Sequence, residues 1–208
     1  MIITISGPSS TGKTSLLESL KDYQDFIERV AKRPVVFGKE SIREVVSQRY
    51  GQKSLQDIFA DPEESIKLQF EVARYNQDLY ASLMKNSDVL HIYDRGPLDN
   101  LIYTLLCYNS APEKLLQKYS KDFSKYCALN RALSNCINTI FLTKIDYYMD
   151  HPEDDGFRPE LFSALRKVEI ELFNTIFEKN NRVVNLPSSS SERLSAVLSK
   201  ICELGSGN

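Results

Sequence analysis

Short hydrophobic runs alternate with longer segments of mixed polarity along the chain. The runs are rich in β-branched residues and occupy residues 2–5, 35–37, 89–93, 137–142 and 183–184. Between them, apolar residues recur at the three- or four-residue spacing of a helix with one buried face. Strands that alternate with helices indicate a parallel sheet that is covered by helices on both faces. The pattern therefore predicts an α/β fold.

The helical segments carry their own end signals. The first begins at Gly12 or Lys13, and the second opens after Glu40. Pro62 and the two glutamates after it suit the first turn of a helix that we expect to run through Tyr80. Further helices are predicted over residues 97–108, 112–133 and 192–204.

No repeat and no long linker divides the chain into domains. We expect a single domain over residues 1–204, followed by a flexible tail at residues 205–208. Within the domain, residues 111–135 form a helical insertion that is rich in Lys and Tyr. The sequence does not indicate what this insertion does.

Composition excludes some classes of function. A formal net charge of -2 without a basic run does not predict the broad positive surface of a general nucleic-acid-binding protein, although a local basic cleft stays open as an alternative. The four cysteines lack zinc-site spacing and are typical of free thiols in a reducing compartment. No signal peptide and no uncharged apolar stretch of about 18 residues is present. We expect a cytoplasmic protein without a membrane partner, of undetermined oligomeric state.

The segment from Gly7 to Thr14 matches G-x-x-x-x-G-K-[ST], the pattern of a phosphate-binding loop, or P-loop. It lies between a predicted strand and a predicted helix, where backbone N–H groups and the positive end of the helix can face phosphates. Lys13 is expected to bridge the β- and γ-phosphates of ATP, and the Thr14 hydroxyl to bind Mg²⁺. The predicted ATP-binding residues are Gly7, Ser9, Ser10, Thr11, Gly12, Lys13, Thr14 and Ser15.

The third predicted strand ends in an Asp–Arg pair, Asp94 and Arg95. Ligands of open parallel sheets collect at the carboxyl ends of the strands. Asp94 can hold Mg²⁺ through water or accept a proton, and Arg95 can bind a phosphoryl oxygen. The alternative is a surface Asp–Arg pair that starts a helix.

Phosphoryl transfer to an alcohol also needs a carboxylate near the attacking hydroxyl. Glu40 and Asp94 both follow predicted strands, and the sequence does not decide between them. Arg43 lies one helical turn after Glu40, on the same face. A solvated ion pair between Glu40 and Arg43 is the alternative interpretation.

Two further segments carry candidate residues. Residues 146–158 hold five acids and a single arginine, and a lid at this place would close Arg158 over the phosphates. An ordinary acidic loop is the alternative. Gln69 and Arg74 lie on one predicted helix and offer an amide and a guanidinium group to a base or sugar, unless they only form its polar face.

Together, these motifs resemble the P-loop kinases of the nucleoside and nucleotide kinase superfamily, especially the AAA-type ATPase/kinase domains similar to the ribosylnicotinamide kinase domain of the NadR protein. The resemblance spans residues 1–186 and depends most on the D-R-G-x-x-D and D-G-x-R pieces. It implies a three-layer α/β/α fold with a five-stranded parallel sheet, Mg-ATP as donor and a lid after the fourth strand. The phosphates are then surrounded by Lys13, Thr14, Asp94, Arg95 and Arg158. The acceptor is then near Glu40, Arg43 and Asp99.

The leading hypothesis is a kinase that transfers the γ-phosphoryl group of ATP to a hydroxyl or phosphate of a nucleoside- or nucleotide-like small molecule. One alternative is a kinase that acts on a hydroxyl of DNA or RNA, which the near-neutral charge does not favour. Another is a regulatory P-loop ATPase that signals to a partner protein and has no need of a lid arginine.

Overall fold

A computed structural model of the chain describes residues 1–143, 160–178 and 180–206, with the backbone alone for residues 160–166. The described residues form one parallel sheet with the strand order β2-β3-β1-β4-β5. The strands are β1 (Ile2–Ser6), β2 (Val35–Gly38), β3 (Leu90–Asp94), β4 (Thr139–Leu142) and β5 (Val183–Asn185). This confirms the predicted parallel α/β fold.

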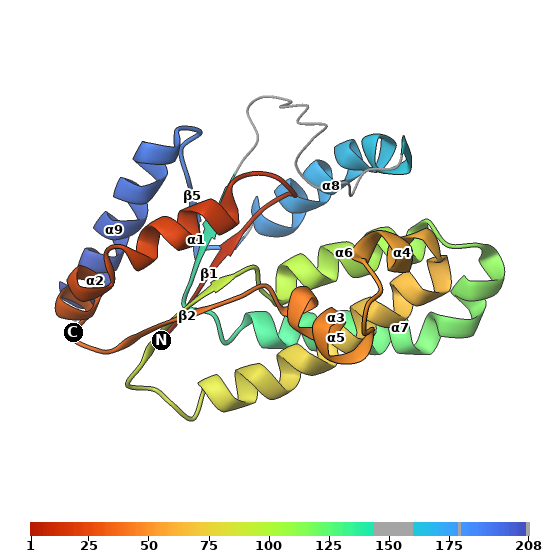
Figure 1. The fold of residues 1–208 in the computed structure, drawn as a ribbon, viewed down its shortest axis with the longest axis horizontal. Helices are drawn as coiled ribbons and strands as arrows, with labels where there is room; N and C mark the ends of the chain where they lie inside the picture. The colour runs from red at the N-terminus through yellow and green to blue at the C-terminus, as the bar shows by residue number, and fades with distance from the viewer. Residues whose placement is uncertain (144–159, 179, 207–208) are drawn as a thin grey trace.

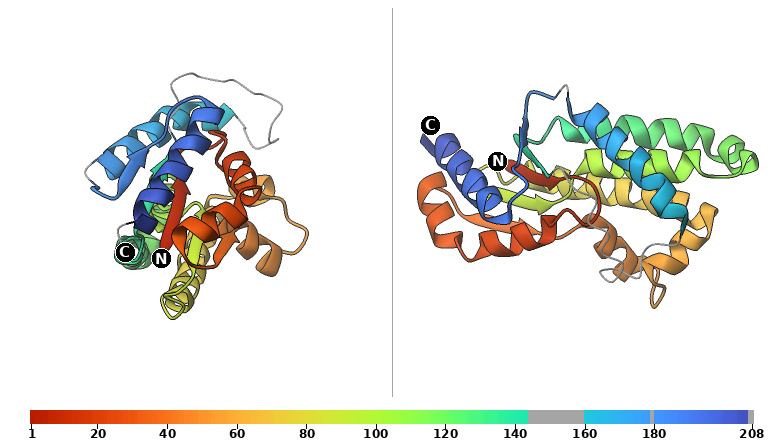
Figure 2. Two further views of the ribbon diagram at one scale, coloured as in Figure 1. Left: turned by 90° about the vertical axis from the view of Figure 1, so that its left-hand side faces the viewer. Right: turned by 90° about the horizontal axis from the view of Figure 1, so that it is seen from above.

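Helices cover both faces of the sheet (Figures 1 and 2). On one face, α1 (Lys13–Lys21), α2 (Gln24–Ala31) and α9 (Ser190–Ser206) pack on Ile3 and Ile5 of β1. On the other, α5 (Pro62–Leu83), α6 (Pro97–Asn109), α7 (Glu113–Ser134) and α8 (Glu160–Glu178) enclose a core that includes Ile2 and Ile140. Successive strand residues point to opposite faces, so β1 contributes Ile3 and Ile5 to the first core and Ile2 to the second.

Two short helices complete a unit beside the sheet. These are α3 (Ser41–Arg49), which directly follows β2, and α4 (Leu55–Ala60), and both pack on α5 through Val45, Ile58 and Leu68. Figure 1 shows α3 to α7 lying together on one side of the molecule, with α1, α2 and α9 on the other.

The helical insertion corresponds to α7, which packs against α5 and α6. Its Tyr126 is buried and stacks on Phe70 of α5, with the ring centroids 4.7 Å apart. At the N-terminus of α5, the Glu63 carboxylate accepts hydrogen bonds from Lys118 at 2.8 Å and Tyr119 at 2.7 Å. The tyrosines of the insertion thus hold α7 on α5.

The predicted flexible tail is wrong for Gly205 and Ser206, because α9 continues to Ser206. Gly205 is buried against α2, and a Cβ atom at this position would lie 2.1 Å from the Val30 backbone oxygen. Glycine normally weakens a helix, but here its missing side chain lets two helices approach closely. Residues 207–208 of the predicted tail lie outside the described residues.

We predict that Gly205→Ala lowers the free energy of unfolding by about 1–3 kcal/mol, because the added methyl group forces α9 away from the α2 backbone. Denaturant unfolding measures the change. Ser206→Ala, an exposed position in the same turn, is the control and is expected to change stability by less than about 0.5 kcal/mol. Equal effects of the two substitutions would contradict close packing at Gly205.

Candidate active site

The P-loop follows β1 and curves around the N-terminus of α1, as predicted. Gly7 has φ 143° and Gly12 has φ 78°, both in a region that favours glycine. A Cβ atom on Gly7 would lie 2.2 Å from Thr143 Oγ1. The first glycine is therefore required by the close approach of the end of β4, and the second by the turn into α1.

Lys13 is buried inside this loop. Its Nζ atom donates hydrogen bonds to the Pro8 backbone oxygen at 2.5 Å and to Thr11 Oγ1 at 3.2 Å. Burial lowers the pKa of Lys13 to about 7, and the nearby Arg95 contributes to the shift. Phosphate oxygens would offset this penalty, since they would place negative charge beside the ammonium group.

Thr14 and Asp94 meet at the ligand edge of the sheet. Thr14 Oγ1 donates to Asp94 Oδ2 at 2.6 Å, while Asp94 Oδ1 is buried and has no hydrogen-bond partner among the described residues. Mg²⁺ prefers oxygen ligands and completes its shell with water and substrate phosphates. A hydroxyl beside an unpaired carboxylate oxygen fits that ion. The described part of the chain holds no group of three or more His, Cys, Asp or Glu residues that could bind a metal without a nucleotide.

Arg95 connects the P-loop to the turn after β2. Its Nε atom lies 2.6 Å from Glu40 Oε1, and its NH1 atom donates to the Gly7 backbone oxygen at 3.2 Å and to the Tyr103 hydroxyl at 3.0 Å. The residue has φ 66°, an uncommon left-handed conformation for arginine. The guanidinium group thus contacts both the P-loop and the residue that precedes α3.

Glu40 is the residue before α3 and is held by Arg95. Burial alone would raise the pKa of Glu40, but Arg95, Lys13 and Arg43 together lower it below its usual value. Arg43 Nε lies 3.2 Å from Glu40 Oε2, yet most of the Arg43 side chain is exposed. The structure thus presents an ionised carboxylate, with Arg43 on its outer side.

Asp99 supports the P-loop from α6. Its carboxylate accepts hydrogen bonds from Ser6 Oγ at 2.7 Å, from the Gly7 amide at 3.2 Å and from the Gly96 amide at 3.0 Å. Burial raises the pKa of Asp99, whereas these donors favour its charged form. The structure therefore gives Asp99 a bracing position at the start of the loop, at one wall of the pocket described below.

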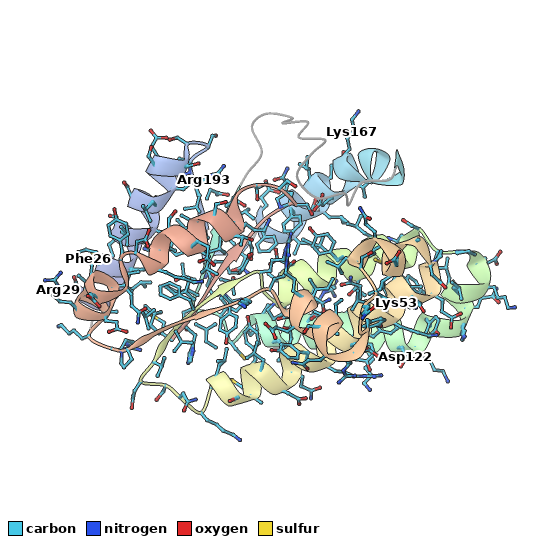
Figure 3. All side chains as sticks on the ribbon, in the orientation of Figure 1. Phe26, Arg29, Lys53, Asp122, Lys167 and Arg193 are labelled. Atoms are coloured by element: carbon cyan, nitrogen blue, oxygen red, sulfur yellow. The ribbon has the colours of Figure 1, made fainter. Side chains whose placement is uncertain are left out.

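Sequence reasoning missed two residues that hold the P-loop. Glu169 of α8 is buried, and its Oε1 atom accepts from the Ser9 amide at 2.8 Å and from the Tyr103 hydroxyl at 2.6 Å. Arg193 of α9 donates to the Thr11 backbone oxygen and to the Pro187 backbone oxygen, each at 2.6 Å. Figure 3 shows Arg193 reaching from α9 towards α1. No sequence motif marks either residue.

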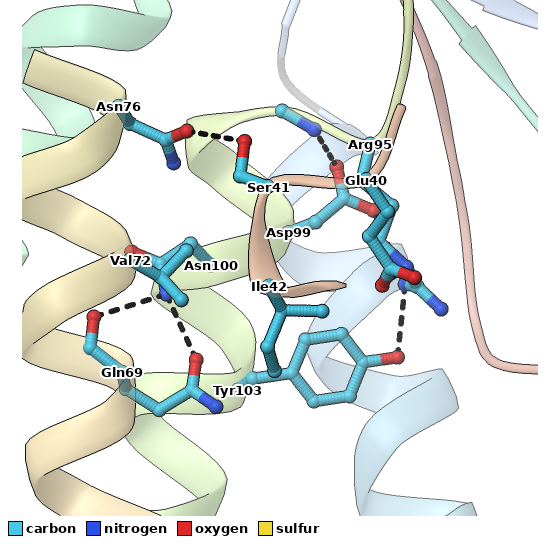
Figure 4. Close-up of a pocket in the computed structure, with 11 residues that line it drawn as sticks. Glu40, Ser41, Ile42, Gln69, Val72, Asn76, Arg95, Asp99, Asn100 and Tyr103 are labelled. Atoms are coloured by element: carbon cyan, nitrogen blue, oxygen red, sulfur yellow. Dashed lines mark hydrogen bonds and ion pairs between the residues drawn. The ribbon is translucent and has the colours of Figure 1, made fainter. Parts of the chain in front are cut away.

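An open pocket begins beside Arg95 and Asp99 (Figure 4). Its walls come from the residue after β2 and the start of α3, from the turn after β3, from α5 and from α6. The lining residues are Glu40, Ser41, Ile42, Gln69, Val72, Asn76, Arg95, Gly96, Asp99, Asn100 and Tyr103.

Only some of the residues that were predicted to bind the acceptor molecule line this pocket. Glu40, Gln69 and Asp99 line it, whereas Arg43 and Arg74 are not among its lining residues in the described part of the chain. The Arg74 guanidinium instead donates to the Tyr126 hydroxyl and lies over the Tyr126 ring. Arg158 and the predicted lid over residues 146–158 lie outside the described residues.

A family model described as AAA domain matches residues 2–193. The chain belongs to this family. The match confirms the expected relation to AAA-type domains. None of the described helices is long and apolar enough to cross a membrane. A search of curated proteins gives no match.

Two solved thymidylate kinases share the fold. The enzyme from Candida albicans has a TM-score of 0.60 and 14% identity, and the alignment covers 96% of this chain and 90% of that one. The enzyme from Ehrlichia chaffeensis has a TM-score of 0.51 and 18% identity, with 98% and 97% coverage. The AAA-domain chain therefore has the three-layer architecture of a P-loop nucleotide kinase.

We predict that Lys13 destabilises the nucleotide-free protein at neutral pH. The pKa of Lys13 is about 7 in the fold and 10.5 ordinarily, so between these values the unfolded chain binds a proton that the folded chain does not. The loss in free energy of unfolding that Lys13 causes therefore shrinks as the pH rises, by up to about 1.4 kcal/mol per pH unit. Denaturant unfolding of wild type and Lys13→Met from pH 7 to 10 measures it. A stability difference that stays constant with pH would contradict the prediction.

Proposed function

We propose that the protein is an ATP-dependent kinase that transfers the γ-phosphoryl group to a hydroxyl or phosphate of a nucleoside- or nucleotide-like small molecule. The observation that carries the proposal is the pocket beside the P-loop. Arg95 and Asp99 line this pocket and also form hydrogen bonds with the Gly7 backbone of the P-loop. An ATPase that only hydrolyses nucleotide does not need a second polar pocket at this place. The two structural neighbours are named for action on a nucleotide, which supports an acceptor of this kind.

The donor side of the reaction is assigned to the P-loop. Lys13 would exchange its hydrogen bonds to the Pro8 and Thr11 oxygens for hydrogen bonds to phosphate oxygens. Arg95 already lies beside the P-loop, through its hydrogen bond to the Gly7 backbone oxygen, and can contact the transferred phosphoryl group from there. Mg²⁺ held by Thr14 and Asp94 would neutralise charge on the phosphates when bound. Arg158 stays part of the proposal as the lid arginine that excludes water.

On the acceptor side, Glu40 is the proposed base. It lines the pocket, whereas Asp94 does not line it and is tied to Thr14. With its pKa held low by Arg95, Lys13 and Arg43, despite the opposing effect of burial, the Glu40 carboxylate is ionised and can accept the proton of an attacking hydroxyl at Oε1 or Oε2. An acceptor that already carries a phosphate would need no such base, and Glu40 would then serve only to position Arg95.

We infer a cytoplasmic location from the cysteines. Cys107, Cys127, Cys136 and Cys202 are all free thiols in the structure. Free thiols persist in reducing compartments.

We predict that γ-labelled ATP passes its label to at least one nucleoside or nucleotide in a panel that also contains short DNA and RNA oligonucleotides. Lys13→Ala is expected to lower the rate by on the order of 100- to 1000-fold, because it removes a cation from the phosphates. Label transfer to oligonucleotides alone would instead support the nucleic-acid kinase. ATP turnover without transfer to any compound would support the regulatory ATPase and overturn the proposal.

A Glu40→Gln substitution separates the two kinds of acceptor. For a hydroxyl acceptor, kcat is expected to fall by roughly 100- to 10,000-fold while ATP affinity is kept, because the amide cannot take up the proton. Steady-state kinetics with the acceptor from the panel, together with ATP binding by calorimetry, measure the effect. Glu18→Gln, an exposed position on α1, is the matched control and should leave kcat unchanged. With a hydroxyl acceptor, a normal kcat in Glu40→Gln would exclude Glu40 as the base.

A further inference from the structure

A pair of buried threonine hydroxyls joins the P-loop to the end of β4. Thr143, the residue directly after β4, is fully buried, and its Oγ1 atom lies 2.6 Å from Thr11 Oγ1. Thr11 donates to the Pro8 backbone oxygen at 2.9 Å and accepts from Lys13 Nζ at 3.2 Å. The P-loop motif leaves the residue type at position 11 open, and Thr143 lies outside the motif. The hydroxyl pair is therefore a feature of this chain and does not follow from the motif.

The two hydroxyls can direct their hydrogens in two ways, because each carries only one. In the first arrangement, Thr143 donates to Thr11, and Thr11 donates to the Pro8 oxygen. In the second, Thr11 donates to Thr143, and Thr143 donates to the Ser6 backbone oxygen at 3.1 Å. The Ser6 oxygen also accepts from the Thr143 amide at 2.9 Å, so it is paired in both arrangements. The Pro8 oxygen receives a hydroxyl hydrogen in the first arrangement alone.

Lys13 determines which arrangement the loop needs. In the nucleotide-free structure its Nζ atom donates to the Pro8 oxygen at 2.5 Å and to Thr11 Oγ1, so both oxygens are paired in either arrangement. If Lys13 turned to phosphate oxygens, it would withdraw both of these hydrogens. Pro8 and Thr11 are buried, and a buried oxygen that is left unpaired costs free energy. After the exchange, only the first arrangement pairs both oxygens.

We propose that Thr143 is a positioning residue for the P-loop lysine and that it acts through Thr11. When Lys13 binds phosphate oxygens, Thr143 would donate to Thr11, and Thr11 would donate to the Pro8 oxygen. The hydroxyl pair thus supplies the hydrogens that Lys13 withdraws, and it lowers the free energy that the exchange costs. The inference rests on the proposed function, because it describes how the loop releases its lysine to ATP.

The first test removes the Thr143 hydroxyl. In Thr143→Val, which keeps the shape of the side chain, Thr11 Oγ1 still accepts from Lys13 in the empty loop but would have no donor from Thr143 once ATP binds. The Kd of Mg-ATP, measured by calorimetry without an acceptor, is expected to rise by about 3- to 10-fold. Thr143→Ser restores the hydroxyl and is expected to restore most of the affinity. Thr139→Val, which changes a buried threonine at the start of β4, is the matched control and should leave the Kd unchanged.

A Thr143→Val protein that binds ATP as tightly as the wild type would overturn the inference and leave the kinase proposal standing. If the wild type itself binds no ATP, the proposed function fails, and the inference fails with it. Thermal unfolding of each variant verifies that the protein is folded at the temperature of the calorimetry.

The second test is a double-mutant cycle that separates positioning from packing. Thr143 also contacts the Ser6 backbone oxygen and lies close to Gly7, so its replacement can weaken the loop without involving Thr11. In a Thr11→Val background, Thr143 has no hydroxyl to supply, and Thr143→Val is expected to change the Kd of Mg-ATP no further. A rise in Kd of equal size in both backgrounds would give Thr143 a structural role and overturn the inference.

Discussion

The ion pair between Glu40 and Arg95 is the contact on which the arrangement of the site depends. Both side chains are largely buried, and their charged atoms lie 2.6 Å apart. Arg95 also binds the Gly7 backbone oxygen, so one guanidinium group joins the end of β2, the end of β3 and the P-loop. Loss of either partner would leave a buried charge, which costs about 3–5 kcal/mol in proteins.

The same ion pair connects the donor side of the proposed reaction, where Arg95 contacts the phosphoryl group, with the acceptor side, where Glu40 is the proposed base. Arg95 holds the Glu40 carboxylate in its ionised form, which weakens it as a base. A phosphoryl group that draws on the same guanidinium charge would loosen that hold and strengthen the base. The carboxylate would therefore become most reactive when the donor is in place, which guards against proton transfer in an empty site.

The sequence predicted the parts of the site that a strand end or a local motif specifies. The P-loop, Asp94 and Arg95 were found because strand position and residue type agree at those places. Arg74 was grouped with Gln69 because both are polar and share a helix. Five residues correspond to about 140° of rotation, however, so the two side chains cannot line one pocket.

Glu169 and Arg193 could not be predicted in this way. Their partners in the P-loop are backbone groups of Ser9 and Thr11, and a backbone group leaves no trace in the residue type of its partner. The same holds for Gly205, whose role depends on the Val30 carbonyl of another helix. The six residues of α4 are too few to show a helical period, whereas α2 was missed although Ile27 and Ala31 are buried at helical spacing.

The contact between Glu169 and the Ser9 amide has a consequence for the helix that carries it. Glu169 Oε1 accepts a hydrogen bond from the Ser9 amide of the P-loop. Amides of such a loop are otherwise suited to bind phosphate oxygens. A phosphate that binds the Ser9 amide in place of Glu169 must also change the free energy of packing of α8 against the P-loop. Thermodynamic reciprocity then requires that the position of α8 set the affinity of the loop for nucleotide by the same amount.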